Sequence, residues 1–273
     1  ERLDEASPRS ERYSVSGDLG ADMPYKAPHL SALAATLVEN ALPAPALKGL
    51  ITDLDDTVWR GLVGEVGATG VSWHLDLQSG IHAAYQGLLK GLTDQGVLLA
   101  IASKNDPEVA GIALARKDLR FDLNKVFPVE ISWGAKSEAV ERILSCWNIG
   151  ADSVVFVDDS PLEVAEVQSR FPGITALVFP TNDDASVLRL MGNLRDLFGR
   201  CRISEEDRLR ATTIRQSAEM RSKGAVQDSV GTEDFLKSLD AILTFNFRVD
   251  PSDIRPLDLV NKTNQFNLNG RRL

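Results

Sequence analysis

Five short apolar runs constrain the fold of this chain more than any other feature. They cover residues 47–52, 96–103, 125–131, 153–159 and 174–179. Stretches with apolar residues at helical spacing lie between them, and another such stretch, HLSALAATLVEN, precedes the first run. Continuously apolar strands that alternate with amphipathic helices are typical of a parallel sheet covered on both faces. The pattern therefore predicts an α/β fold with a doubly wound parallel sheet.

Reactive side chains stand at the ends of the predicted strands or just after them. They are Asp53 after the first strand, Ser103, Lys104 and Asn105 at the end of the second, Lys136 at the start of the helix after the third, and Asp158 and Asp159 at the end of the fourth. In such sheets ligands bind just beyond the carboxyl ends of the strands. We therefore expect these residues to converge on one binding site.

The first of these strand ends carries three carboxylates within four positions, at Asp53, Asp55 and Asp56. Like charges this close repel one another by about 1 kcal/mol in water and by more in a dry site. The crowding therefore predicts a bound cation. For Asp56 we favour a plainer role, capping the turn after the first strand, and we leave it outside the predicted site.

Composition limits the class of protein. Of the 273 residues, 43% are hydrophobic and 25% are charged, and the net charge of −9 disfavours nucleic acid as a partner. No apolar run approaches the roughly 20 residues that cross a membrane, and no signal peptide opens the chain. Cys146 and Cys201 lack the spacing of a metal site or a disulfide scaffold. We expect a cytoplasmic protein that binds neither nucleic acid nor membrane.

The chain divides into three predicted parts. Residues 1–28 are polar and proline-containing and are expected to form an arm or linker, residues 29–200 to form the α/β core, and residues 201–273 to form a helical and strand extension that leads to a missing downstream region. Between the first two strands, Gly61, Gly64, Gly67 and Gly70 predict a small hairpin flap and no large cap domain. Such a site would stay open to a bulky partner.

The order of the reactive residues resembles the haloacid-dehalogenase-like (HAD) superfamily of phosphate-transferring enzymes, which has a Rossmann-like core. Residues 53–57, DLDDT, match its first motif, DxDxT. Ser103 matches the second motif, Lys136 the third, and the pair Asp158 and Asp159 the acidic fourth. All four motifs stand in the order of the superfamily.

A closer resemblance runs from about residue 34 to the last residue. The blocks DLDDTVWRGLVGEVG, IASKNDPEVA, VEISWGAKSEAVERI, NIGADSVVFVDDSPLEVAEVQ and NKTNQFNLNGRRL are similar to the FkbH-like family of polyketide biosynthesis. This resemblance implies a glyceryl transferase/phosphatase that takes the acyl group of 1,3-bisphosphoglycerate and removes phosphate. The glycerate would then be loaded on the phosphopantetheine thiol of an acyl carrier protein.

The resemblance also implies the catalytic and metal-binding residues. Asp53 would attack phosphorus as the nucleophile, and Asp55 would protonate the leaving oxygen and then activate water. Mg²⁺ would be held by Asp53, the main-chain carbonyl of Asp55 and Asp158. Asp159 is a further candidate, for which a water-mediated metal contact and an ion pair with Lys136 both remain open.

The remaining candidate residues would bind the phosphate and the substrate. Lys136 and Ser103 would neutralise and orient the phosphoryl oxygens, because this transition state needs positioning and charge stabilisation. Asn105 and Thr57 complete the set. Thr57 could be only a helix or turn cap, but its position in the family motif favours a contact with the nucleophile. The histidines lack metal-ligand spacing and are expected to be ordinary core or surface residues: His29, His74 and His82.

Two other functions remain open from the sequence. One is a HAD phosphatase that acts on a small molecule, and the other is a non-catalytic module that recruits a carrier protein. The segment 200–223 has a net charge of +3, from seven basic and four acidic residues, and is either a solvated helix face or a docking surface for an acidic carrier protein. The complete set of reactive residues disfavours an inert module.

Overall fold

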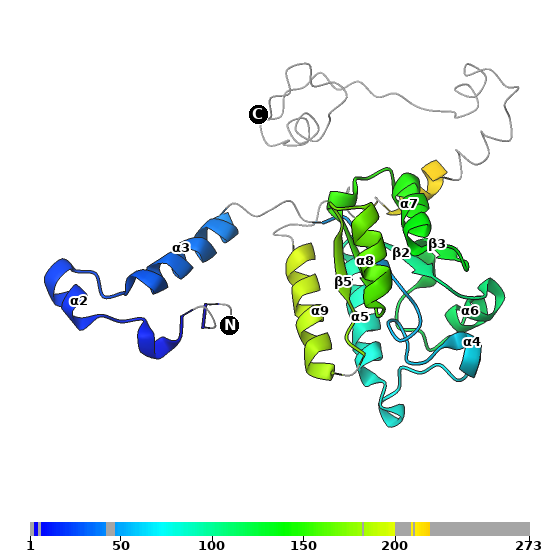
Figure 1. Cartoon of the computed structure of the whole chain (residues 1–273), viewed down its shortest axis with the longest axis horizontal. Helices are drawn as coiled ribbons and strands as arrows, with labels where there is room; N and C mark the ends of the chain where they lie inside the picture. The colour runs from blue at the N-terminus through cyan, green and yellow to red at the C-terminus, as the bar shows by residue number, and fades with distance from the viewer. Residues whose placement is uncertain are drawn as a thin grey trace, which may run out of the picture. The chain divides into compact units, whose positions relative to one another are not determined.

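The computed structural model describes residues 3–4, 7–41, 47–181, 183–199, 209 and 211–218 of the chain (Figure 1). Its contacts divide the chain into two units, residues 1–221 and 222–273. The second unit lies outside the described residues, as does most of the predicted extension from residue 201. The predicted division into three parts therefore stays a prediction.

A five-stranded parallel sheet forms the centre of the first unit. Its strands are β1 (Gly49–Thr52), β2 (Leu98–Ser103), β3 (Val126–Ile131), β4 (Val154–Asp158) and β5 (Thr175–Val178). They lie in the order β3-β2-β1-β4-β5, and every neighbouring pair is parallel. Each strand falls within one of the five apolar runs. The predicted doubly wound parallel α/β fold is confirmed.

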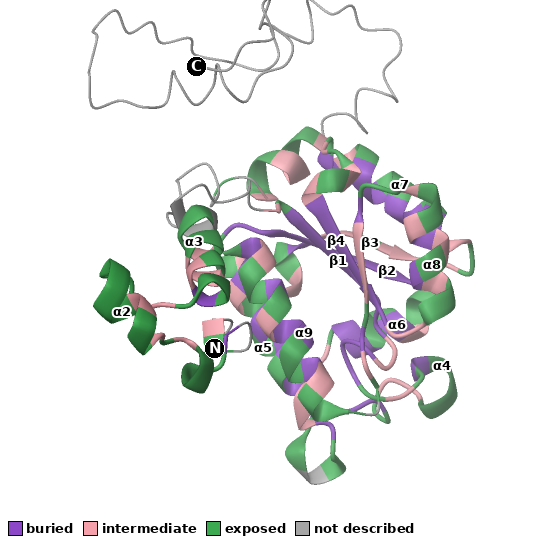
Figure 2. Ribbon diagram, turned by 60° about the vertical axis from the view of Figure 1, so that its left-hand side comes forward, coloured by how far each residue is buried: buried purple, intermediate pink, exposed green. Residues whose placement is uncertain are grey.

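Helices cover both faces of this sheet. Successive residues of a strand point to opposite faces, so neighbouring strand residues pack against different helices. Leu50 packs into the core on the side of α5 (Gly80–Asp94), α6 (Pro107–Leu114) and α9 (Asp184–Phe198). Ile51, the next residue, packs against α7 (Lys136–Trp147) and α8 (Pro161–Arg170) on the other side. The inner strands β1, β2 and β4 are buried throughout, which explains why their sequences are apolar without alternation (Figure 2).

The connection from β1 to α5 forms a small flap, defined here as residues 53–79. It contains the short helices α4 (Val63–Val66) and η2 (Leu75–Leu77), and one antiparallel bridge joins Arg60 to Ser72. Trp73 of the flap is buried, and the guanidinium of Arg116 lies 4.0 Å from the centre of its ring. Arg116 Nη1 also donates to the carbonyl of Val71 at 2.7 Å. The flap is thus packed against the core.

The N-terminal segment contains helices where the sequence predicted an arm or linker. These are the short η1 (Arg9–Glu11), α2 (Val15–Ala21) and α3 (Ala27–Ala41), the last of which begins within the predicted arm. Two further short helices, η3 (Leu123–Lys125) and η4 (Ala151–Ser153), precede β3 and β4. No helix in the described part of the chain is long and apolar enough to cross a membrane.

Candidate active site

The predicted reactive residues lie at the carboxyl ends of the strands. Asp53 directly follows β1, Ser103 is the last residue of β2, and Asp158 is the last residue of β4. Lys136 is the first residue of α7, the helix that follows β3. All four residues are buried, with between 0% and 6% of their surface exposed. The fold therefore brings two carboxylates, a hydroxyl and an ammonium group to one edge of the sheet.

Lys136 lies among three carboxylates. Its Nζ atom is 2.6 Å from Oδ1 of Asp53 and 2.7 Å from Oδ2 of Asp158. Oε2 of Glu163 lies 3.0 Å from the same nitrogen, and Oε1 of Glu163 lies 3.0 Å from Nζ of Lys104. The ammonium group of Lys136 is thereby fixed in position, because it has an anionic partner in three directions.

The pKa values of these groups reflect burial and mutual charge. Burial raises the pKa of Asp53, and the charge of Lys136 opposes this change. Burial and the neighbouring charge of Asp53 raise the pKa of Asp158 to about 7. Burial also raises the pKa of Asp159 to about 6. For Lys136, burial disfavours the charge, but the carboxylates of Asp53, Asp158 and Glu163 outweigh it and raise the pKa. The ammonium group therefore stays protonated at neutral pH.

The cluster is short of positive charge. Four carboxylates, those of Asp53, Asp158, Asp159 and Glu163, face two ammonium groups, those of Lys136 and Lys104. Asp53, Asp158 and Asp159 each offer one carboxylate oxygen within 4.8 Å of the others. Oxygen ligands of this kind suit Mg²⁺, and a divalent cation would balance the excess negative charge. The residues present therefore fit the predicted Mg²⁺.

Asp55 is held beside this cluster by hydrogen bonds. Trp59 Nε1 donates to its Oδ1 at 2.8 Å, and the main-chain N–H of Val63 donates to the same oxygen at 3.1 Å. Asn105 Nδ2 donates to Oδ2 of Asp55 at 3.1 Å and to Oγ of Ser103, also at 3.1 Å. Asn105 thus links the ends of β1 and β2. The contacts place Asp55 in one fixed orientation, as a group that passes protons to a substrate needs.

Comparison with known proteins gives structural matches. No family model and no curated protein matches this chain. It is similar to the solved N-terminal part of protein BF1531 from Bacteroides fragilis, which contains a phosphatase domain complexed with Mg, with 25% identity and a TM-score of 0.56. The match covers 70% of this chain and 52% of that structure, so this chain spans about half of its length.

Two more distant solved structures also match. One is an uncharacterised protein from Corynebacterium glutamicum, with 22% identity and a TM-score of 0.38 over 56% of this chain and 96% of that one. The other is the cobalt-bound deoxy-D-mannose-octulosonate 8-phosphate phosphatase of Haemophilus influenzae, with 16% identity and a TM-score of 0.32 over 72% of this chain and 98% of that one.

The match to the Mg-complexed phosphatase domain agrees with the motifs at the strand ends. The chain has the haloacid-dehalogenase-like fold. Within this HAD-like fold, the first, second and fourth motifs follow β1, end β2 and end β4, and the third begins α7. The acidic cluster and the Mg-complexed neighbour together support the prediction of Mg²⁺ as the cofactor.

For two residues of the first motif, Asp56 and Thr57, the sequence left the contacts undecided, and the structure describes them. Oδ1 of Asp56 accepts a hydrogen bond from the N–H of Gly61 at 2.7 Å, and Asp56 has φ of +47°. Its predicted role in the turn is confirmed. Thr57 is fully buried, and its Oγ1 is the one buried side-chain polar atom without a hydrogen-bond partner in the described part of the HAD-like core. Its predicted contact with the nucleophile is therefore absent from the described contacts.

Sequence reasoning missed two residues of the HAD-like site. Glu163, in the first turn of α8, contacts both Lys136 and Lys104, and His82 Nδ1 lies 2.9 Å from the carbonyl oxygen of Thr57. Glu163 lies only five positions after Asp158, and its place in the first helical turn was a usable signal. The sequence left two roles open for Asp159. Among the described residues Asp159 forms no ion pair with Lys136, but its carboxylate belongs to the group of oxygens that could bind a metal ion.

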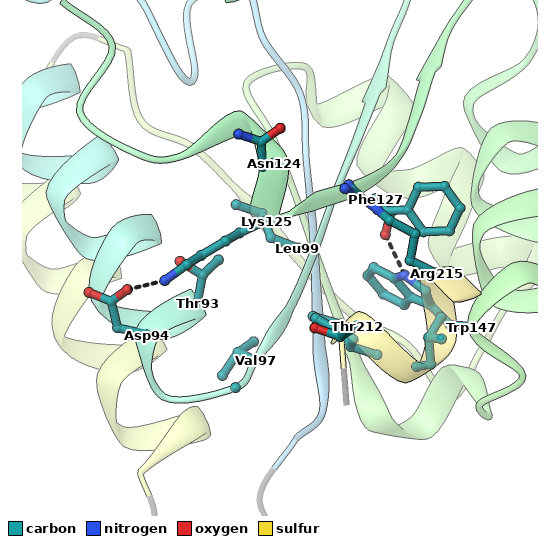
Figure 3. Close-up of a pocket in the computed structure, with 14 residues that line it drawn as sticks. Thr93, Asp94, Val97, Leu99, Asn124, Lys125, Phe127, Trp147, Thr212 and Arg215 are labelled. Atoms are coloured by element: carbon teal, nitrogen blue, oxygen red, sulfur yellow. Dashed lines mark hydrogen bonds and ion pairs between the residues drawn. The ribbon is translucent and has the colours of Figure 1, made fainter. Parts of the chain in front are cut away.

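A separate cavity of about 370 Å³ lies at the opposite edge of the sheet, near the start of β2 (Figure 3). Lys125 pairs with Asp94 on one side of it, and Trp147 donates to the carbonyl of Phe127 on the other. Arg215 donates to the carbonyl of Val126 at 3.0 Å. The charged side chains of this cavity thus already have partners, and the cavity contains none of the catalytic candidates.

Proposed function

We infer that this chain is a Mg²⁺-dependent phosphatase in which Asp53 is the nucleophile. One observation carries this proposal. Lys136 Nζ lies within 2.7 Å of both Asp53 and Asp158, and those two carboxylates share a site with Asp159. A buried set of carboxylates around one fixed ammonium group can bind a divalent cation and a phosphoryl group together. The Mg-complexed phosphatase domain with the same fold supports the same activity.

The reaction follows from the placement of the carboxylates. One carboxylate oxygen of Asp53 attacks phosphorus, the bond from phosphorus to the ester oxygen breaks, and Asp55 gives its proton to that oxygen. The result is a phosphoryl group bound to Asp53. Asp55 then takes a proton from water, which attacks phosphorus and releases phosphate from Asp53. Trp59 and Asn105 keep Asp55 in the orientation for both proton transfers.

Charge stabilisation completes the mechanism. When bound, Mg²⁺ would be held by Asp53, Asp158 and Asp159 and would supply positive charge to a phosphoryl oxygen. Lys136 neutralises another phosphoryl oxygen and keeps the Asp53 carboxylate in place. Ser103, which lies beside Asp53 and Asn105, orients the third oxygen by hydrogen bonding.

The more specific proposal is glyceryl transfer in polyketide biosynthesis, in the cytoplasm. The chain would take the acyl group of 1,3-bisphosphoglycerate, remove phosphate and load glycerate on an acyl carrier protein. Its support is the FkbH-like resemblance over five blocks of sequence, together with a small flap between β1 and α5 in place of a large cap domain. Arg215 is removed from the docking surface proposed on segment 200–223, because its half-buried side chain donates a hydrogen bond to β3. Arg208 and Arg221 lie outside the described residues.

One incubation tests this proposal at both levels. The chain is mixed with Mg²⁺, 1,3-bisphosphoglycerate and a holo-acyl carrier protein, and the carrier is weighed by mass spectrometry while free phosphate is measured. We expect a carrier heavier by one glyceryl group and release of phosphate. Phosphate release without loading would favour the small-molecule phosphatase and contradict glyceryl transfer. Neither product, together with no hydrolysis of simple phosphate esters, would contradict phosphatase function.

A further inference from the structure

A second cavity, of about 800 Å³, opens to solvent beside the first motif. The polar residues that line it include Asp56, Arg60, Gln78, His82, Thr181 and Asp184. They come from the flap, the first turn of α5, the segment after β5 and the first residue of α9. In a parallel sheet these segments all lie at the carboxyl ends of the strands, as the catalytic carboxylates do. The cavity therefore lies where the part of a substrate beyond its phosphate can bind.

His82 is the best-fixed polar side chain of this cavity. Only 5% of the residue is exposed, and its ring stacks on Phe179 with the ring centres 5.6 Å apart. Its Nδ1 atom lies 2.9 Å from the carbonyl oxygen of Thr57. A carbonyl oxygen can only accept a hydrogen bond, so Nδ1 carries the proton. The ring is thereby held in one orientation and one tautomer.

The second ring nitrogen of His82 has no hydrogen-bond partner among the described residues, and it keeps some exposure to the cavity that His82 lines. Burial lowers the pKa of His82, so the ring is neutral at pH 7. A neutral ring that is protonated at Nδ1 has an acceptor at Nε2. A ligand that reaches this nitrogen displaces water from it, so a donor on the ligand must replace the hydrogen bond of that water. The donor that this nitrogen requires is an O–H or N–H group.

The charged residues around the cavity are of both signs. Arg60 uses one guanidinium nitrogen on the carbonyl oxygens of Leu77 and Gln78, at 3.1 and 3.3 Å. Asp56 and Asp184 contribute two carboxylates, so the charged lining is negative by one. Hydroxyl groups donate to carboxylates and to His82, and they accept from Arg60. The lining therefore suits an uncharged, hydroxylated group.

We propose that this cavity binds the hydroxyl-bearing carbon chain of a phosphate ester, with Nε2 of His82 accepting a hydrogen bond from one hydroxyl. The inference rests on the proposed phosphatase function, because it names the class of substrate that the same site takes. It assigns His82 to recognition of the substrate. The sequence did not indicate this role, because His82 lacks metal-ligand spacing and was expected to be an ordinary core or surface residue.

Glycerol 3-phosphate and propyl phosphate test this role, because they share a three-carbon chain and differ in hydroxyl groups. With Mg²⁺, the parent chain should show a kcat/KM about tenfold higher for glycerol 3-phosphate, the effect of one additional hydrogen bond. His82→Asn retains an N–H donor for the Thr57 carbonyl and lacks Nε2. It should lose this preference, because kcat/KM should fall about tenfold more for glycerol 3-phosphate than for propyl phosphate. His74→Asn is the matched control, because His74 pairs with Asp118 outside this cavity.

A preference that persists in His82→Asn would overturn the inference, and so would an equal loss of activity toward both esters. Binding separates this failure from failure of the phosphatase proposal. Isothermal titration of Asp53→Asn with each ester and Mg²⁺ should show about tenfold tighter binding of glycerol 3-phosphate, lost when His82→Asn is added. Equal binding of the two esters, or no binding of glycerol 3-phosphate, would contradict the inference whether or not the parent releases phosphate.

Discussion

Nζ of Lys136 lies 2.6 Å from Oδ1 of Asp53, although 83 positions separate these residues in the sequence. Both groups are buried, with side chains 2% and 8% exposed, so water screens their attraction little. The contact joins the end of β1 to the start of α7 and also fixes the nucleophile that we propose.

Replacing Lys136 tests this contact. Lys136→Ala should lower kcat by at least about 100-fold, because the phosphoryl group loses a positive partner and Asp53 loses its anchor. Asp56→Asn should change kcat by less than about threefold, because its Oδ1 can still accept from Gly61. Steady-state phosphate release checks both variants. A mild Lys136→Ala beside a severe Asp56→Asn would reverse these assignments.

Glu163 is predicted to position Lys136. Glu163→Gln removes one of three anions around the ammonium group, so Lys136 should be drawn more strongly to Asp53 and Asp158 and compete with Mg²⁺. We expect kcat to fall about tenfold and half-maximal activity to need more Mg²⁺. Mg²⁺ titration of the activity measures both effects. Glu141→Gln, which alters an exposed pair with Arg170, is the control. An unchanged Mg²⁺ requirement in Glu163→Gln would refute this role.

Variants of two buried tryptophans distinguish a hydrogen bond needed for catalysis from one needed only for stability. Trp59 Nε1 donates to Asp55, whereas Trp147 Nε1 donates to the carbonyl of Phe127 at the opposite edge of the sheet. Phenylalanine removes the donor in each case and retains most of the apolar surface. Trp59→Phe should lower kcat by about tenfold, because Asp55 loses one of its fixed contacts, while Trp147→Phe should affect only stability. Activity and thermal unfolding of both variants provide the comparison, and equal kcat values for them would count against the role of Asp55.

The acidic cluster predicts how pH changes the effect of Mg²⁺ on stability. The pKa of Asp158 is raised to about 7 and that of Asp159 to about 6, both first by burial. Because these values lie above the unfolded value of about 4, the carboxyl groups favour the metal-free fold at low pH. That contribution is lost as the pH rises through about 6 to 7, when charged carboxylates remain uncompensated.

Mg²⁺ should therefore raise the melting temperature more at pH 8 than at pH 5.5. At pH 8 the ion binds ionised carboxylates, whereas at pH 5.5 it competes with protons. Thermal unfolding with Mg²⁺ and with excess chelator at each pH measures the difference. An equal or larger Mg²⁺ effect at pH 5.5 would show that these carboxylates do not bind the ion.

Much of the fold was predictable because burial on both faces makes inner strands continuously apolar. The runs that became β1, β2 and β4 show this, and the polar residue at the end of each marks the site edge. The contacts of Glu163 and His82 were not predictable in the same way. Each depends on how a helix packs beside a strand end. The sequence places Glu163 in a first helical turn near Asp158 but does not indicate that Lys136 is its partner, and His82 has no comparable signal. For Arg215, the sequence left a solvated face and a docking surface both open, and it gave no sign of the contact with β3.

Phosphate release by the parent chain and by Asp53→Asn, each with Mg²⁺ and with excess chelator, tests the central claim most directly. Asn retains the size of the side chain and removes the attacking carboxylate. We expect release by the parent with Mg²⁺, its loss in chelator, and a decrease of at least about 1,000-fold in Asp53→Asn. Release that continues in Asp53→Asn, or that persists in excess chelator, would contradict a Mg²⁺-dependent phosphatase with Asp53 as its nucleophile.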